Sequence, residues 1–186
     1  MDINKLLAFG DKPDDSQDEK LKHRFLIYIG TLMSCGGILW GSICAYFNLL
    51  IPAIIPYGYV VLTILNLIYF AKSKNFKVSS FNQILISMLL PFFLQWSLGG
   101  FEPSGAVMLW ALLSIVASLT ISKATSNIKW LAIFAILTLF TGFIDSSLDT
   151  FKLDVPHNIR TVFFVVNIVI ISGIIFTLII YVLNNR

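Results

Sequence analysis

Metal and haem chemistry needs several ligands that converge on one point, and this sequence offers only two histidines and two cysteines. Cys35 and Cys44 lie nine residues apart in one apolar stretch, which places them on opposite sides of a helix. His23 precedes the first apolar stretch and His157 the last, so a membrane is expected between them. We therefore expect no metal site and no resident cofactor, and we interpret both histidines as exposed loop or interface residues.

Catalytic groups are also missing from the pattern. The sequence contains no nucleophile with a base partner, no pair of carboxylates inside an apolar stretch and no phosphate-binding glycine loop followed by lysine. No charged residue lies near the middle of an apolar stretch, where ion-coupled carriers place theirs. We do not expect this chain to be an enzyme, and a small transporter or channel is the weaker alternative.

The most distinctive polar and aromatic residues gather around a reversal at residues 95–113. Gly99, Gly100 and Pro103 favour a turn, after which Ser104 is expected to N-cap the next helix. A tight helical hairpin with interfacial aromatic rings explains this stretch without a ligand. The alternative is an outward-facing binding site, because polar and aromatic groups converge where two helices turn. Its candidate residues are Gln95, Trp96, Glu102, Ser104, Trp110 and, in the segment before the last apolar stretch, His157.

The elements that position these residues must be membrane helices. Hydrophobic residues make up 57% of the 186-residue chain and charged residues 12%, against about 45–50% and about 25% in soluble domains. The apolar stretches that we interpret as spans cover residues 25–47, 49–71, 81–101, 106–122, 130–144 and 161–183. We predict an all-α bundle of six transmembrane helices over residues 25–186, preceded by a cytoplasmic tail over residues 1–24.

Lysine and arginine predict the orientation of this bundle. One side holds eleven of them, at positions 5, 12, 20, 22, 24, 72, 74, 77, 123, 129 and 186, and the other side holds Lys152 and Arg160. Because basic loops stay on the cytoplasmic side, both termini are expected to be cytoplasmic. The spacing of Ser16 and Glu19 is that of a capping box, so a juxtamembrane helix is expected to begin there.

Small residues predict where helices pack closely. Gly37, Gly41 and Ala45 form a stripe at four-residue spacing, and Ser114 and Ser118 form a similar face in the fourth span. Whether the stripe meets a helix of the same chain or of a second subunit is left open by the sequence.

Prolines and amides predict bent helices and polar contacts within the bilayer. Pro52, Pro56 and Pro91 are each expected to remove a helical hydrogen bond and kink the helix. Kinks beside polar side chains open cavities, which favours a ligand pocket in the outer half. The amides expected to join helices are Asn66, Gln83, Gln95 and Asn167.

Several short runs occur in a fixed order along nearly the whole chain. They are Leu6-Leu7-Ala8-Phe9-Gly10-x-x-Pro13-x-Asp15, basic residues 20–24, Leu39-Trp40-Gly41, Leu98-Gly99-Gly100-Phe101-x-x-Ser104-x-Ala106-x-x-Leu109-Trp110-Ala111-Leu112-Leu113, and Thr161-Val162-Phe163-Phe164-Val165-Val166-Asn167. In these runs the sequence resembles the six-transmembrane N-terminal domain of bacterial class III adenylate/guanylate cyclases, which is also attached to some sensor kinases. In that family the sixth span continues into a signalling helix and the cyclase, whereas this sequence ends at Arg186, so we expect an isolated membrane domain.

The resemblance implies a receptor-like membrane anchor in the bacterial inner membrane that forms a homodimer and passes a membrane-side signal to a cyclase producing cyclic AMP. We expect the ligand to be a lipid, a quinone or another small molecule, and no nucleic acid to bind. The sixth span contains no proline and is expected to carry the signal, with Asn167, Gly173 and Arg186 on the output path. The alternatives are the anchor of a sensor histidine kinase, a transporter or channel, and a haem-binding electron carrier.

Overall fold

The computed structural model describes residues 9–121, 124–148 and 157–184, and every regular element in these ranges is a helix. In chain order they are α2 (Gln17–Tyr46), α3 (Leu50–Ser73), α4 (Phe76–Ser97), α5 (Phe101–Ser104), the 3₁₀ helix η1 (Val107–Ala111), α6 (Leu112–Ile121), α7 (Ala124–Leu148) and α8 (His157–Asn184). Helices α2, α3, α4, α7 and α8 are long and apolar enough to cross a membrane. The predicted all-α fold is therefore confirmed, and the five long apolar helices are consistent with a membrane bundle.

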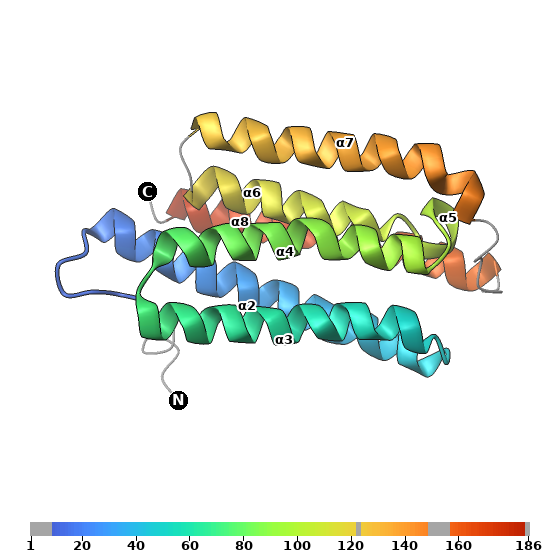
Figure 1. Cartoon of the computed structure of the whole chain (residues 1–186), viewed down its shortest axis with the longest axis horizontal. Helices are drawn as coiled ribbons and strands as arrows, with labels where there is room; N and C mark the ends of the chain where they lie inside the picture. The colour runs from blue at the N-terminus through green and yellow to red at the C-terminus, as the bar shows by residue number, and fades with distance from the viewer. Residues whose placement is uncertain (1–8, 122–123, 149–156, 185–186) are drawn as a thin grey trace.

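The helices lie side by side in an elongated bundle (Figure 1). We call the end that holds the start of α2, the end of α3 and the end of α8 the basal end. The distal end holds the α2–α3 turn, α5 and the end of α7. Helix α7 lies on the outside, where it packs against α6 and α4, and most of its apolar side chains are exposed. Such exposed apolar faces suit a lipid environment.

The fourth apolar stretch differs most from its prediction as one helix over residues 106–122. Helix α5 ends at Ser104, Gly105 and Ala106 adopt left-handed conformations with φ of 60° and 54°, and η1 then leads into α6. The predicted N-cap at Ser104 is wrong, because its hydroxyl instead bonds to the Gln95 Oε1 and the Phe101 carbonyl. Together η1 and α6 extend about 25 Å, less than the about 30 Å of a hydrocarbon core.

Other local predictions meet mixed outcomes. The capping box is confirmed: the Ser16 hydroxyl accepts from the Glu19 N–H, and the Glu19 carboxylate accepts from the Ser16 N–H. The Ser16 hydroxyl also donates to the Glu19 carboxylate at 2.7 Å, and this bond, followed by the one from the Ser16 N–H, lowers the pKa of the Glu19 carboxyl below its ordinary value. Pro52 was expected to remove a helical hydrogen bond, but it removes none. It lies in the first turn of α3, where N–H groups have no helical acceptor.

The fifth apolar stretch, predicted over residues 130–144, lies within the longer helix α7, which has 25 residues. One prediction about exposure is wrong. His23, expected to be exposed, is buried between the rings of Phe70 and Phe76, whose centroids lie 5.3 and 4.8 Å from that of the imidazole. The N-terminal turn, residues 9–16, was not predicted to fold back on the helix, and it places the carboxylates of Asp11 and Asp15 at 3.6 and 3.3 Å from the His23 Nδ1.

The glycine stripe packs α2 against α3 of the same chain. A Cβ added at Gly37 would lie 2.9 Å from the Pro56 carbonyl oxygen, and one at Gly41 would lie 2.8 Å from the Tyr57 ring. Ala45, at the end of the stripe, is exposed. The question left open by the sequence is thus answered for the two glycines, which contact a helix of their own chain.

The serines of the second small-residue face turn inward. Ser114 and Ser118 of α6 are fully buried, and their hydroxyls donate to the carbonyls of Ala111 and Ile115 at 2.6 and 2.8 Å. Because each hydroxyl bonds to the carbonyl three residues earlier, in η1 for Ser114 and in α6 for Ser118, this face of α6 packs closely without needing a polar partner from another long helix.

Amides join α3 to α4, as predicted. The Gln83 Nε2 donates to the Tyr59 and Thr63 hydroxyls at 2.9 and 3.1 Å, and the Asn66 Nδ2 donates to the Gln83 Oε1 at 3.1 Å and the Ser79 carbonyl at 2.9 Å. All of these groups are buried and neutral. Neighbouring helices therefore hold each other through polar contacts that would be costly to break in hydrocarbon.

We expect Gly37→Ala to destabilise the bundle by about 1–3 kcal/mol, because its methyl group would press on a backbone carbonyl that has no rotamer to change. The control is Gly58→Ala, since a Cβ at Gly58 meets nothing within 4 Å. Thermal unfolding of both variants in the same detergent checks this, and equal melting temperatures would show that the stripe is not a tight contact.

Candidate ligand-binding cavity

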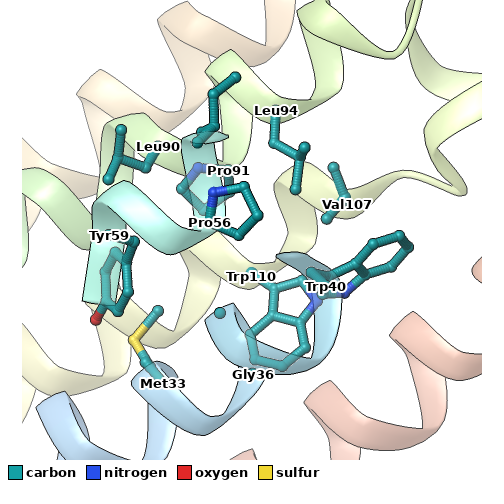
Figure 2. Close-up of a pocket in the computed structure, with 12 residues that line it drawn as sticks. Met33, Gly36, Trp40, Pro56, Tyr59, Leu90, Pro91, Leu94, Val107 and Trp110 are labelled. Atoms are coloured by element: carbon teal, nitrogen blue, oxygen red, sulfur yellow. The ribbon is translucent and has the colours of Figure 1, made fainter. Parts of the chain in front are cut away.

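A cavity of about 40 Å³ lies between α2, α3, α4 and η1. One water molecule needs about 10–15 Å³ by the same measure and a cavity that binds benzene has about 150 Å³, so this cavity admits part of an alkyl chain, and a ring enters only if the walls move apart. Its position is closer to the distal end, because Trp40 is near the end of α2 and Pro56 is in the second turn of α3. Its walls are formed by Met33, Gly36, Gly37, Trp40, Ile55, Pro56, Tyr59, Leu90, Pro91, Leu94, Val107 and Trp110 (Figure 2).

Two prolines and a glycine make room for this cavity. Pro56 and Pro91 lie inside α3 and α4, and both line the wall (Figure 2). A proline cannot donate to the preceding turn and its ring keeps neighbours away, so two of them on adjacent helices prevent close packing. On the opposite side, a Cβ at Gly36 would collide with the Trp110 ring, so only glycine admits the indole here.

Nearly all polar groups of the cavity wall have hydrogen-bond partners within the protein. The Tyr59 hydroxyl lies 3.0 Å from that of Ser87 and accepts from Gln83, and the Trp110 Nε1 donates to the Asn167 Oδ1 at 2.8 Å. The Trp40 Nε1 is buried and has no hydrogen-bond partner among the described residues. A buried N–H without a partner is costly, so an occupant with an acceptor oxygen would be favoured over a pure hydrocarbon.

Next to the cavity, the reversal between α4 and η1 is buried irregular backbone. Such backbone is tolerated within a bilayer only where the protein satisfies its polar groups. The Gln95 Oε1 accepts from the Met108 N–H at 3.3 Å, and the Asn167 Nδ2 donates to the carbonyls of Ser104 and Gly105 at 3.3 and 2.8 Å. We call Gln95 and Asn167, both fully buried, the amide clamp.

Both indoles of the cavity wall contact α8. Trp110 bonds to Asn167, and the Trp40 ring packs edge-to-face on Phe163 with centroids 4.9 Å apart. Phe163 and Asn167 lie one turn apart, so they share a face of α8. A Cβ at Gly105 would lie 2.5 Å from the Phe164 backbone nitrogen, which shows how closely the reversal and α8 approach. Both indoles of the cavity wall are therefore in direct contact with α8.

Polar contacts nearer the distal end fasten the reversal to its neighbours. The Asp145 carboxylate of α7 accepts from the Phe101 N–H at 3.0 Å, and Arg160 of α8 pairs with Glu102 at 3.0 Å. The Trp96 indole donates to the Thr141 hydroxyl of α7 at 3.0 Å. The reversal is thus tied to α7 as well as to α8.

The structure does not bring the six candidate site residues together in one place. Gln95, Ser104 and Trp110 come together at the buried reversal, and of these only Trp110 lines the cavity. Trp96 turns toward α7, and Glu102 is exposed beside Arg160. The side chain of His157 lies outside the described residues.

The residues expected on the output path also separate. Asn167 is part of the amide clamp, whereas Gly173 is exposed on α8 with no atom within 4 Å of a Cβ placed there. Arg186 lies outside the described residues.

Most of the cavity was not predicted as a site. The prolines predicted room in this region, but the roles of Tyr59 and Trp40 follow only from the packing of α2, α3 and η1. Asp145 was missed because its partner is a backbone N–H 44 residues away, which has no signature in the sequence.

Comparison with known proteins adds no identification. No protein-family model, no curated protein and no solved structure matches this chain. Function is therefore inferred from the chemistry of its own residues.

We expect Asn167→Leu to lower the stability by about 1–3 kcal/mol, because it leaves two carbonyls and an indole N–H without partners. The control is Asn82→Leu, which removes the same amide from an exposed position of α4. Thermal unfolding in nanodiscs checks the difference, and an equal effect of the two substitutions would show that the clamp contributes nothing.

Occupancy of the cavity is expected to quench Trp40 and Trp110 selectively. A short-chain benzoquinone and a brominated fatty acid, both contact quenchers of indole fluorescence, distinguish a quinone from a lipid chain. Saturable quenching should survive in the Trp96→Phe/Trp130→Phe variant and disappear in the Trp40→Phe/Trp110→Phe variant. Equal quenching of the two variants by both probes would instead indicate contact through the bilayer alone.

Proposed function

We propose that this chain is the membrane receptor domain of a bacterial signalling enzyme, with a class III nucleotidyl cyclase as the output domain. It binds a small apolar ligand in the cavity and passes the signal through α8. The observation that carries this proposal is the contact of both cavity indoles with one face of α8, through Phe163 and Asn167. The resemblance of the sequence to cyclase membrane domains supports the choice of output domain.

In this proposal the bundle has six spans with both termini in the cytoplasm. The segment Val107–Ile121 serves as the short fourth span, with the buried reversal filling the remaining depth. The distribution of charge supports the orientation. Among the described lysines and arginines, Arg160 lies at the distal end, and the basal end holds Lys12, Lys20, Lys22, Arg24, Lys72, Lys74, Lys77 and Lys129.

The ligand that fits the wall is apolar, slim and equipped with an oxygen acceptor. The carbonyl-bearing part of a lipid acyl chain meets these requirements, and a benzoquinone ring does so if the walls move apart, because each can enter from the bilayer and accept from the Trp40 N–H. Two-state coupling requires that the ligand prefer one arrangement of the wall by about 1–3 kcal/mol. The Trp110–Asn167 bond then biases the position of α8.

Helix α8 is suited to carry this change to the basal end. Its 28 residues contain no proline and extend about 42 Å. We place a homodimer contact on the exposed apolar faces of the bundle, with Gly173 of α8 allowing close approach. Signalling would follow from a changed spacing of two α8 ends.

The competing function is a small transporter or channel. It requires a polar route between the two ends, and ion coupling usually requires buried ionisable groups. Apart from His23 near the start of α2, the buried polar side chains of the described spans are those of serine, threonine, asparagine and glutamine, and the walls of the cavity are chiefly apolar. Both observations favour the receptor, which predicts no solute flux in liposomes. The anchor of a sensor kinase would differ from the proposal only in its output domain.

The test is a chimaera in which a class III cyclase catalytic domain follows Arg186. A short-chain quinone or fatty acid that binds the cavity should change cyclic AMP production, by about 5–150-fold for a coupling of the usual size. Trp110→Phe should abolish most of the response while the probe still quenches Trp40, because the ring remains and the bond to Asn167 is lost.

Trp96→Phe is the matched control, since it removes a comparable indole bond, to Thr141, outside the cavity. An unchanged response in Trp110→Phe would contradict coupling through α8. Solute flux through liposomes containing this chain alone would favour the transporter.

A further inference from the structure

The N-terminal turn is fixed against the basal end of the bundle. The Phe9 ring packs on Phe70 of α3 with centroids 6.3 Å apart, and the Lys74 ammonium donates to the Phe9 carbonyl. Gly10 is buried, and a Cβ there would collide with the Phe70 ring. The residues that follow Gly10 are therefore held in a defined position before α2 begins.

This turn places two carboxylates against a buried imidazole. The His23 Nδ1 lies 3.3 Å from the Asp15 Oδ2 and 3.6 Å from the Asp11 Oδ1. The three side chains are 6%, 11% and 14% exposed, in that order. Asp11 and Asp15 come from the turn and His23 from α2, so the cluster joins two segments of the chain.

Two atoms of this cluster lack the partners that burial normally demands. The Asp11 Oδ1 and the His23 Nδ1 are both buried, and neither has a hydrogen-bond partner among the described residues. Arg24 approaches the other oxygen of Asp11, at 3.5 Å, and the Lys12 N–H donates to the Asp15 Oδ2 at 2.6 Å. Since unpaired buried polar atoms are rare, their convergence points to a ligand that would satisfy both.

The separations match the donors of a tetrahedral metal ion. Zinc binds imidazole nitrogen and carboxylate oxygen at about 2.1 Å, and two such donors at a tetrahedral angle lie about 3.4 Å apart. The 3.3 and 3.6 Å separations of the cluster bracket this value. All three donor atoms lie within 4.8 Å of one another, so small side-chain rotations would bring them to one ion.

We propose that Asp11, Asp15 and His23 bind one divalent transition-metal ion of the zinc class, with water in the fourth position. Calcium and magnesium are disfavoured because they take six or more oxygen ligands, whereas an imidazole suits the zinc class. A hollow lined by Lys12, Glu19 and Lys74 adjoins the cluster and gives water and an ion access. Two carboxylates balance the charge of the ion, and the neighbouring lysines moderate the affinity.

The bound ion links the N-terminal turn to α2, because Asp11 and Asp15 come from the turn and His23 from the helix. His23 also packs on Phe70 of α3 and Phe76 of α4, so the ion fixes the turn where three helices meet. This role is independent of the cavity and of the proposed receptor function. It needs only that the turn and α2 share a ligand.

The test is a titration of the purified full chain with Co²⁺, after chelator treatment and without a histidine tag. Tetrahedral Co²⁺ gives intense visible absorption, so one equivalent per chain is expected to develop that spectrum and Zn²⁺ to displace it. Asp11→Asn, Asp15→Asn and His23→Gln should each weaken binding by more than the about 10–100-fold typical of losing an outer-shell partner. Zn²⁺ should raise the melting temperature of the wild-type chain and leave that of the three variants unchanged.

The chain offers matched controls. Asp14→Asn removes the same charge from an exposed position of the same turn, and His157→Gln removes the other histidine. Both should bind Co²⁺ like the wild type. If His23→Gln does not fold, the two aspartate variants decide, because their side chains lie at the rim and keep their size.

Three outcomes would overturn the proposal. They are absence of a tetrahedral Co²⁺ spectrum, equal weakening by Asp14→Asn and Asp11→Asn, and displacement of Co²⁺ by Mg²⁺ or Ca²⁺ as readily as by Zn²⁺. The first would mean that the three side chains contact one another without binding an ion, and the second that the overall charge of the turn, and not ligation, attracts the ion.

Discussion

Buried backbone within an apolar bundle must find hydrogen-bond partners inside the protein, and this constraint shapes the reversal between α4 and η1. Gln95 of α4 accepts from the Met108 N–H, and Asn167 of α8 donates to the carbonyls of Ser104 and Gly105. An apolar residue at either position would leave those groups unpaired where no water replaces them. The amide clamp is therefore the interaction on which the rest of the distal half depends.

The cavity and its link to α8 follow from the clamp. Because the clamp holds η1 inside the bundle, Trp110 reaches Gly36 of α2 and lines the cavity together with Trp40. The Asn167 amide donates to the backbone of the reversal and also accepts from the Trp110 indole. One side chain of α8 is therefore bonded both to the reversal and to the cavity wall. The proposed binding site and the proposed output helix thus share a hydrogen-bond network, through which a small displacement at the wall would reach α8.

Composition, charge and helical spacing predict the all-α membrane bundle, the capping box at Ser16 and the amide contacts between α3 and α4, because these depend on local pattern. The η1 segment was predicted as one helix, since nothing in an apolar stretch shows that Gly105 and Ala106 take left-handed conformations. The Asp11–His23 cluster was missed for a related reason: a turn that folds back on a helix has no periodic signal. Pro56 and Pro91 did predict a cavity, but the walls of that cavity come from helices that are far apart in the sequence.

The claim that occupancy of the cavity moves α8 is tested most directly by pulsed EPR distances between spin labels at Lys72 and Leu183, exposed positions near the ends of α3 and α8. The native cysteines, Cys35 and Cys44, would be replaced first. Saturating short-chain benzoquinone should shift the distance distribution in the wild-type background, and the shift should vanish in Trp110→Phe. Identical distributions with and without the quinone, while fluorescence shows that the cavity is occupied, would contradict the account.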